Sequence, residues 1–179
     1  TLLGAVDAAV GGKTGINFGG LKNEIGVINS SKSVVINADF FRTLDAENLR
    51  SGYAEMIKHG LISNTEIWKH ILSFDLDNVD YNRLSELLLE SISVKEKVVE
   101  IDPTEKGLRK VLNFGHTVGH AFESYAMEIG KPVLHGYAVA WGMISELYLS
   151  YKLLGFPKEA LSTAVRMIKE NYGALPIKC

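Results

Sequence analysis

The sequence predicts a mainly α-helical fold preceded by a short, glycine-rich α/β segment. From about residue 46 onward, apolar residues recur at helical spacing, whereas residues 1–45 are rich in glycine and lack this period. Of the 179 residues, 46% are hydrophobic, which is enough to bury a sizeable core. We therefore predict two units, an α/β tail over residues 1–45 and a helical domain over residues 46–179.

The individual elements follow from the apolar pattern and from its breaks. The apolar run at residues 34–36 predicts a short buried strand that ends at Asn37. Asp102-Pro103 predicts a helix end, because the residue before proline disfavours the α region, and Gly155-Phe156-Pro157 separates two further helices. The predicted helices span residues 49–62, 81–101, 107–128, 136–154 and 158–171.

Composition excludes several function classes. A net charge of −2 with mixed signs gives no reason to expect nucleic acid or a membrane surface as a partner, and no apolar run approaches the roughly 18 residues of a membrane span. The single cysteine, Cys179, is the last residue, which excludes an internal disulfide and fits a cytoplasmic protein. Because the chain starts at Thr1 without a methionine, we expect it to be a piece of a longer polypeptide.

Three of the five histidines lie within twenty residues, at His116, His120 and His135, each with a glycine nearby. Upstream, Glu55 offers a carboxylate, and one glutamate with two histidines is a ligand set that holds catalytic zinc with an open position. A single histidine on an apolar face is more often a core residue, but this density favours a metal or anion site. Spacing alone favours His116 and His120 as joint ligands, because residues i and i+4 share a helix face.

Lysines beside glycines or carboxylates indicate an anionic ligand. Gly11-Gly12-Lys13-Thr14 ends like a phosphate-binding loop, but the first glycine of that motif is missing and Asp7 would repel a phosphate. A glycine turn that presents Lys13 to an anion is the better interpretation, with a plain turn and a solvated lysine as the alternative. Lys58 lies three residues after Glu55 among apolar neighbours, which favours a buried ion pair over a surface one.

Glu105, Arg109 and Asn113 precede His116 at steps of four, four and three. If this segment is helical, they form one polar stripe that leads into the histidines. Such a stripe is usually the solvated face of a helix, but one that ends in two histidines beside glycines favours a cleft lined by anion- and metal-binding groups.

These motifs together resemble the 3-dehydroquinate synthase family. The resemblance is carried over essentially the whole chain by Gly-Gly-Lys-Thr-Gly-Ile-Asn, Ala-Glu-Met-Ile-Lys, Leu-Arg-Lys-x-Leu-Asn-Phe-Gly-His-Thr-x-Gly-His-Ala and Leu-His-Gly. It implies that Glu55, His116 and His135 bind Zn²⁺ or Co²⁺ while His120 faces the substrate, against the pairing that spacing favours. It also implies that residues 1–45 end an N-terminal nucleotide-binding domain and that residues 46–179 form the metal- and substrate-binding domain.

The resemblance implies roles for further residues. The implied catalytic residues are Lys58, Glu105, Arg109, Asn113 and His120; the implied substrate contacts are Asp7, Lys13, Asn23 and Lys95; and the implied NAD contacts are Thr1, Lys13, Lys22, Phe40, Phe41, Arg42 and Thr43. Tyr137 departs from the glutamate that many relatives have after His-Gly, and we expect it to tune the metal site without abolishing it.

The implied activity is conversion of a seven-carbon keto-acid phosphate into 3-dehydroquinate with loss of phosphate, using NAD and a divalent metal. The implied full-length enzyme is a homodimer, and we expect the present chain alone to be inactive. Two alternatives are another sugar-phosphate cyclase, such as a 2-deoxy-scyllo-inosose synthase, and a non-enzymatic metal-binding helical module. A panel of substrates would distinguish another sugar-phosphate cyclase from a 3-dehydroquinate synthase. Turnover by the complete protein would distinguish an enzyme from a non-enzymatic metal-binding module.

Overall fold

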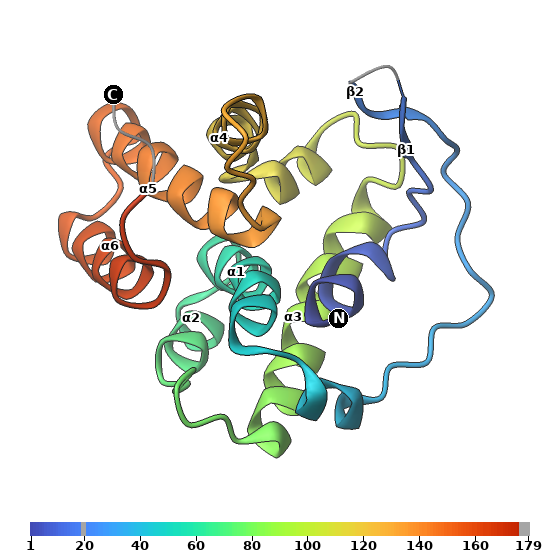
Figure 1. Cartoon of the computed structure of the whole chain (residues 1–179), viewed down its shortest axis with the longest axis horizontal. Helices are drawn as coiled ribbons and strands as arrows, with labels where there is room; N and C mark the ends of the chain where they lie inside the picture. The colour runs from blue at the N-terminus through green and yellow to red at the C-terminus, as the bar shows by residue number, and fades with distance from the viewer. Residues whose placement is uncertain (19–20, 176–179) are drawn as a thin grey trace.

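The computed structural model describes residues 1–18 and 21–175, without the side chains of residues 17 and 21–24. The described part is mainly helical, with one small antiparallel hairpin in which Ile16 pairs with Ile25 (Figure 1). The elements are, in order, η1 (Gly4–Ala8), β1 (Ile16–Phe18), β2 (Leu21–Ile25), η2 (Ala38–Thr43), α1 (Ala46–Ile62), α2 (Thr65–Leu72), α3 (Tyr81–Ile101), η3 (Leu108–Asn113), α4 (His116–Glu128), α5 (His135–Leu154) and α6 (Lys158–Tyr172).

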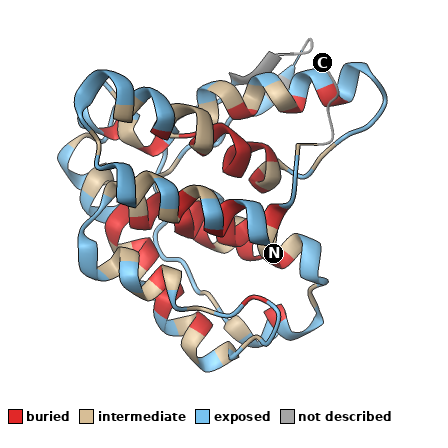
Figure 2. Ribbon diagram, turned by 90° about the vertical axis from the view of Figure 1, so that its left-hand side faces the viewer, coloured by how far each residue is buried: buried red, intermediate tan, exposed pale blue. Residues whose placement is uncertain are grey.

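Helix α1 is the centre of the fold. It contacts α2, α3 and α5, and its residues from Ser51 to Gly60 are all buried. Figure 2 shows that buried residues gather where the helices face one another. The side chain of Asp45 caps this helix by accepting a hydrogen bond from the Asn48 amide at 2.8 Å. A Cβ on Gly52 would lie 2.5 Å from the Leu3 nitrogen, so this glycine lets the N-terminal segment pack directly on α1. The buried face of α1 therefore carries Glu55 and Lys58 into the interior.

The long helix α3 spans Tyr81–Ile101, the range that the sequence predicts. The predicted helices at 49–62, 136–154 and 158–171 are also present, each longer than predicted by one to three residues. The sequence analysis missed α2, which begins where Asn64 accepts hydrogen bonds from the Glu66 and Ile67 amides at 3.0 Å. Within the described residues, no helix is both long and apolar enough to cross a lipid bilayer.

The predicted strand at residues 34–36 is wrong. This segment carries no strand assignment, and Val35 is 92% exposed. The physical reason is that no described strand lies beside it to supply hydrogen bonds, so an apolar run with strand propensity remains irregular.

The predicted helix over residues 107–128 is interrupted. A 3₁₀ turn, η3, ends at Asn113, and Gly115 then adopts a left-handed conformation with φ of 79° before α4 begins at His116. A Cβ on Gly115 would lie 2.5 Å from the Met143 side chain, so the close approach of α5 requires glycine at this break. Glu105, Arg109 and Asn113 consequently do not form a continuous helical stripe, and Glu105 itself has a left-handed φ of 58°.

Candidate metal and anion site

The structure brings the three clustered histidines together from two helices. His116 and His120 occupy the first turns of α4, and His135 begins α5. One ring nitrogen of each lies within 4.8 Å of those of the other two, and the ring centroids of His116 and His135 are 5.2 Å apart. Imidazole nitrogens converging at this range suit a divalent transition metal.

Glu55 reaches the same point from α1. Its Oε1 atom lies 3.4 Å from His116 Nε2 and 3.7 Å from His135 Nε2, while Oε2 pairs with the Lys58 ammonium. Both Glu55 and Lys58 are almost fully buried, as the apolar flanks of this pair predict. Burial favours a raised pKa, but the Lys58 ammonium and the His116 imidazole outweigh it and hold the pKa of Glu55 well below its ordinary value.

The donor set fits a metal. Glu55 Oε1 is buried and has no hydrogen-bond partner in the described part of the chain, although an orphaned carboxylate oxygen is costly. A cation held between this oxygen and the two facing Nε2 atoms would satisfy it. The geometry admits two ligand sets, either the three histidines or Glu55 with His116 and His135. Both sets place the metal at the same point between α1, α4 and α5.

Positively charged side chains surround this donor cluster. Lys13, Lys58, Lys95 and Arg109 all line a cavity of about 350 Å³ together with the histidines. Lys95 bonds to both the carboxylate and the carbonyl oxygen of Asp7, which also faces the cavity. Burial lowers the pKa of Lys95, whereas Asp7, despite its own burial, has a lowered pKa because Lys95 and Lys58 lie close.

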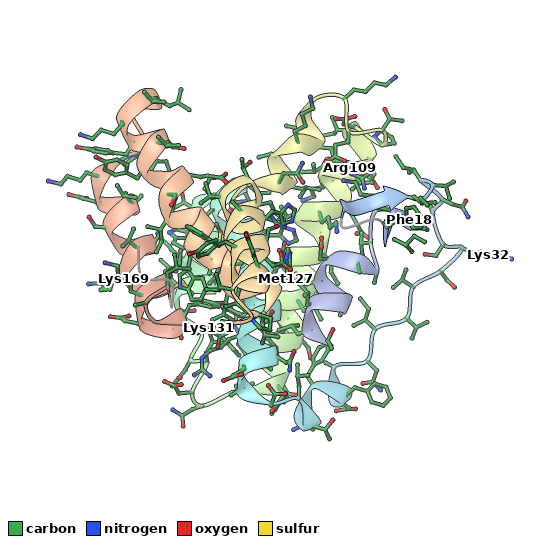
Figure 3. All side chains as sticks on the ribbon, turned by 45° about the horizontal axis from the view of Figure 1, so that its top comes forward. Phe18, Lys32, Arg109, Met127, Lys131 and Lys169 are labelled. Atoms are coloured by element: carbon green, nitrogen blue, oxygen red, sulfur yellow. The ribbon has the colours of Figure 1, made fainter. Side chains whose placement is uncertain are left out.

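Arg109 is anchored by backbone carbonyls. Its Nη1 donates to Pro103 O at 2.8 Å and its Nη2 to Gly11 O at 2.7 Å, and the side chain is 2% exposed. In Figure 3, Arg109 lies where the segment after α3 approaches the N-terminal strands. Gly11 has a φ of 106°, and a Cβ there would lie 2.8 Å from Arg109 Nη2, so the glycine turn admits the guanidinium.

Glu105 joins the cavity rim to the glycine turn. Its carboxylate pairs with Lys13 and accepts a hydrogen bond from Asn113 Nδ2 at 2.8 Å. Its own partial burial raises the pKa, but the hydrogen bonds from Lys13 and Asn113 prevail, so the pKa of Glu105 is lowered. The carboxylate is therefore ionised at neutral pH.

Of the implied nucleotide contacts, Lys13 lines this cavity, whereas the other described ones do not: Thr1, Phe40, Phe41, Arg42 and Thr43. Phe41 is buried in the hydrophobic core, Phe40 is exposed, and Arg42 lies over the Tyr81 ring at 4.8 Å. The Thr43 hydroxyl donates to Phe40 O, and the Thr1 hydroxyl accepts from the Gly4 amide. The side chains of Lys22 and Asn23 lie outside the described residues.

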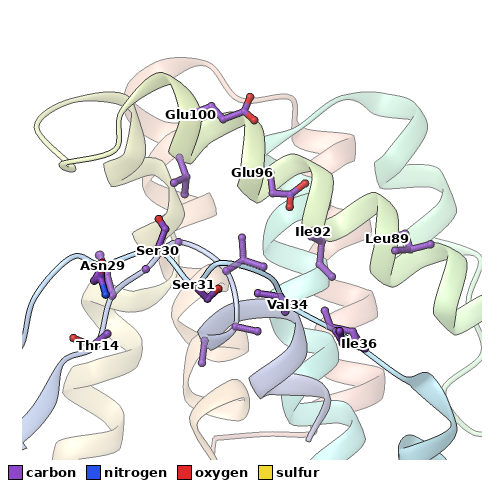
Figure 4. A pocket seen from close by; sticks show the side chains of 18 residues that line it. Thr14, Asn29, Ser30, Ser31, Val34, Ile36, Leu89, Ile92, Glu96 and Glu100 are labelled. Carbon is purple, nitrogen blue, oxygen red and sulfur yellow. The ribbon is translucent and has the colours of Figure 1, made fainter.

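The glycine turn at Gly11 and Gly12 also lines a larger hollow of about 890 Å³ (Figure 4). It runs between α3 and the segment around Ser30 and Val34, and shares only a few residues such as Lys13 with the histidine cavity. Its α3 wall presents Ile92, Glu96 and other aliphatic or acidic side chains. Among the described residues that line it there is no histidine, so the smaller cavity is the candidate metal site.

The family model for the 3-dehydroquinate synthase C-terminal region matches residues 52–179, and the model for its N-terminal region matches residues 1–51. The chain belongs to the 3-dehydroquinate synthase family.

Curated relatives agree with this membership. The 3-dehydroquinate synthase of Parabacteroides distasonis is 58% identical over the whole chain, which covers 51% of that protein. The 3-dehydroquinate synthase of Bacillus pumilus is 45% identical over 87% of the chain and 42% of its own length. The chain thus spans about half the length of the curated relatives that it matches.

Solved structures support the predicted fold class. A 2-deoxy-scyllo-inosose synthase complexed with carbaglucose-6-phosphate, NAD⁺ and Co²⁺ superposes with a TM-score of 0.84 at 24% identity, over 98% of this chain and 48% of that one. The 2-epi-5-epi-valiolone synthase ValA of Streptomyces hygroscopicus, with NAD⁺ and Zn²⁺ bound, gives a TM-score of 0.71 at 24% identity, over 98% and 56%. At this identity the likeness shows the fold alone, and the prediction of a mainly helical domain of the 3-dehydroquinate synthase-like fold is confirmed.

Sequence reasoning missed two acidic residues around the histidines. Glu123 contacts the His135 ring, and Glu146 accepts hydrogen bonds at the start of α4. Glu123 lies three residues after His120, so helical periodicity carries a signal for it. Glu146 has no such signal, because only the packing of α5 on α4 brings it near.

Proposed function

We propose that this chain is the metal- and substrate-binding part of a 3-dehydroquinate synthase, which converts 3-deoxy-D-arabino-heptulosonate 7-phosphate into 3-dehydroquinate and phosphate. Family membership supports the proposal, and so does a cavity that combines metal donors with four cationic side chains. The reaction belongs to the biosynthesis of aromatic amino acids by the shikimate pathway.

The observation that carries the proposal is the unpartnered, buried Oε1 of Glu55, which faces the Nε2 atoms of His116 and His135. We assign these three residues as the metal ligands and His120 as a substrate contact. When bound, Zn²⁺ or Co²⁺ supplies a Lewis acid that makes a substrate hydroxyl easier to deprotonate, and NAD⁺ accepts and returns a hydride.

The cationic residues suit the two anionic ends of the substrate. Lys58, Lys95 and Arg109 are fixed by a carboxylate or by backbone carbonyls before any ligand arrives, so little reorganisation is needed to bind a phosphate and a carboxylate. Arginine also offers paired donors that match such groups. Asp7 holds Lys95 at the cavity wall.

Proton transfer is assigned to Glu105 and His120. The overall change loses phosphoric acid from the substrate and closes a carbon ring, with no net oxidation because the hydride is returned. The family resemblance is the ground for assigning Glu105. Lys13 and Asn113 hold its pKa below the ordinary value, so the carboxylate is ionised and is a weak base that would carry a proton only transiently. His120 lines the same cavity and can serve as a further proton carrier.

The remaining assignments rest on the family resemblance. We propose residues 1–45 as the end of the nucleotide-binding domain, residues 46–179 as the metal- and substrate-binding domain, and a cytoplasmic homodimer as the full-length form. The further substrate contact is Asn23, and the proposed NAD contacts are Thr1, Lys13, Lys22, Phe40, Phe41, Arg42 and Thr43. Within the described residues, the contacts of Phe41 are those of a core residue, so its part would be to support Phe40 and Arg42.

The test is an assay of the full-length protein with NAD⁺, Zn²⁺ or Co²⁺ and the keto-acid phosphate, in which released phosphate and 3-dehydroquinate are both measured. We expect turnover that Glu55→Gln abolishes and that the exposed-site control Glu128→Gln leaves unchanged. Activity on glucose 6-phosphate instead would favour the 2-deoxy-scyllo-inosose synthase alternative. Metal binding without turnover on either substrate would favour a non-enzymatic module.

A further inference from the structure

Helices α4 and α5, which carry the three histidines, pack so closely that their backbones are in contact. A Cβ on Gly142 of α5 would lie 2.0 Å from the Gly115 carbonyl oxygen, and a Cβ on Gly119 of α4 would lie 2.9 Å from the Ala138 carbonyl oxygen. Glycine is therefore required on both sides of this contact. The contact fixes the distance between α4 and α5, but it does not by itself orient the imidazole rings.

Glu123 extends from α4 to the first residue of α5. Its Oε2 atom lies 3.2 Å from His135 Nδ1, and the glutamate is only 7% exposed. A carboxylate at Nδ1 favours the tautomer that carries its proton there, which leaves the lone pair on Nε2. Nε2 is the atom of His135 that faces Glu55 Oε1, at 3.7 Å.

Glu146 extends in the opposite direction, from α5 to the start of α4. Its Oε2 accepts a hydrogen bond from the Gly115 amide at 2.8 Å, and its Oε1 accepts one from the Val118 amide at 3.4 Å. The residue at the N-cap position is Gly115, which has no side chain to serve these amides. A carboxylate from another helix therefore supplies the cap and matches the positive end of the α4 dipole.

The first turn of α4 in turn sets the ring of His116. Its Nδ1 lies 3.2 Å from the Phe114 carbonyl oxygen, within the segment that Glu146 holds, and its Nε2 faces Glu55 Oε1 at 3.4 Å. Displacement of this turn would move His116 and His120 together, since both lie in the first two turns of the helix.

We propose that Glu123 and Glu146 are positioning residues that bind α4 and α5 to each other reciprocally and hold the histidine nitrogens in a geometry ready for a metal. The inference rests on the proposed function, because it assumes a divalent metal at these histidines. Neither glutamate belongs to the ligand set, and each acts through another residue. Glu123 orients His135, and Glu146 orients His116 and His120 through the backbone.

Glutamine is the informative replacement at both positions, because it keeps the shape and removes the charge. In Glu123→Gln the neutral amide accepts more weakly, and it can present its NH₂ group to Nδ1 and favour the wrong tautomer. In Glu146→Gln only one oxygen remains to accept from two backbone amides. Loss of such a partner behind a metal ligand typically weakens metal binding by about 10- to 100-fold.

The experiment titrates Co²⁺ into the full-length protein at 25 °C in competition with a chromophoric chelator, and records the visible spectrum of the saturated Co²⁺ form. The matched control is Glu128→Gln, which removes an exposed carboxylate from α4, the helix that also carries Glu123. We expect Glu123→Gln and Glu146→Gln to bind Co²⁺ about 10- to 100-fold more weakly, with shifted absorption bands, while the control stays within about 2-fold of the wild type.

Three outcomes decide the matter. Wild-type affinity and spectrum in both variants would overturn the inference while leaving the proposed metal site intact. A lower melting temperature with unchanged Co²⁺ affinity and spectrum would also overturn it, because the glutamates would then only stabilise the fold. Failure of the wild type to bind Co²⁺ would remove the proposed metal function and this inference with it. Should one variant not fold, the other carries the same test.

Discussion

Acidification should destabilise this protein through His59. The side chain is completely buried, with Nδ1 2.7 Å from Ser91 Oγ and no partner for Nε2 in the described part of the chain. Burial, followed by the neighbouring Lys58 ammonium, lowers the pKa of His59 from 6.5 to about 3. The imidazole is therefore neutral in the folded protein at all ordinary pH values.

The sign and size of the effect follow from proton linkage. In the unfolded chain His59 takes up a proton below its ordinary pKa near 6.5, whereas the folded protein does not do so until the pH approaches 3. The contribution of the neutral His59 to the free energy of unfolding is therefore complete above pH 6.5, and it is lost progressively as the pH falls below that value. At about pH 5 the loss from this residue is about 2 kcal/mol, since each unit below 6.5 costs about 1.4 kcal/mol.

The assay is denaturant unfolding of the wild type and of His59→Asn between about pH 7.5 and pH 5, with a chelator present in both. Asparagine can keep the hydrogen bond to Ser91 but does not titrate, so its packing cost is independent of pH. Titrations common to both proteins cancel in the difference. We expect the free energy of unfolding of the wild type to fall by about 2 kcal/mol more than that of the variant. Parallel curves for the two proteins would refute the reasoning.

Four further expectations can be checked separately. His135→Ala should remove most of the bound Zn²⁺ from the full-length protein and His120→Ala should not, as measured by metal analysis after dialysis; equal losses would favour the three-histidine ligand set. Gly142→Ala should lower the free energy of unfolding by about 3 kcal/mol, because its Cβ would lie 2.0 Å from the Gly115 carbonyl oxygen, and an unchanged melting curve would contradict this contact. Tyr53→Phe should cost about 1 kcal/mol in the same measurement, because the buried hydroxyl donates to Ile71 O at 2.8 Å and its loss leaves that carbonyl with the longer hydrogen bond from the Phe74 amide at 3.4 Å. The 179-residue chain alone should give no NAD⁺ binding at micromolar concentrations by calorimetry, because the proposed contacts touch only one side of a flexible dinucleotide; tight binding would show that the cofactor site is wrongly assigned.

The period of the apolar residues was sufficient to predict most helices. It was insufficient where contacts between distant segments determine the secondary structure. The α3 helix was predicted over its whole range, because a long apolar stripe and the Asp102-Pro103 stop both lie within the segment itself. The strand at residues 34–36 failed for the opposite reason, since a strand needs a neighbour and its apolar pattern does not supply one. Helix α2 is only eight residues long, and its cap at Asn64 is a weak signal in isolation.

The sequence alone determined which chemical groups this protein contains and which short stretches present them. The motifs around Lys13, Glu55, His116 and His135 resemble one family, and their residue types already indicate a cation-lined metal site. These features are local, because helix period, proline and glycine act on neighbouring residues.

Only the tertiary structure decided how these groups meet. It set the left-handed break at Gly115, which starts α4 at His116, and it left Glu55 Oε1 buried and facing two imidazoles. It also brought Glu146 to the start of α4 across 28 or more residues of chain. The physical reason is that close packing of α4 on α5 and burial of α1 fix distances and desolvation, and neither quantity is a property of a sequence segment taken alone.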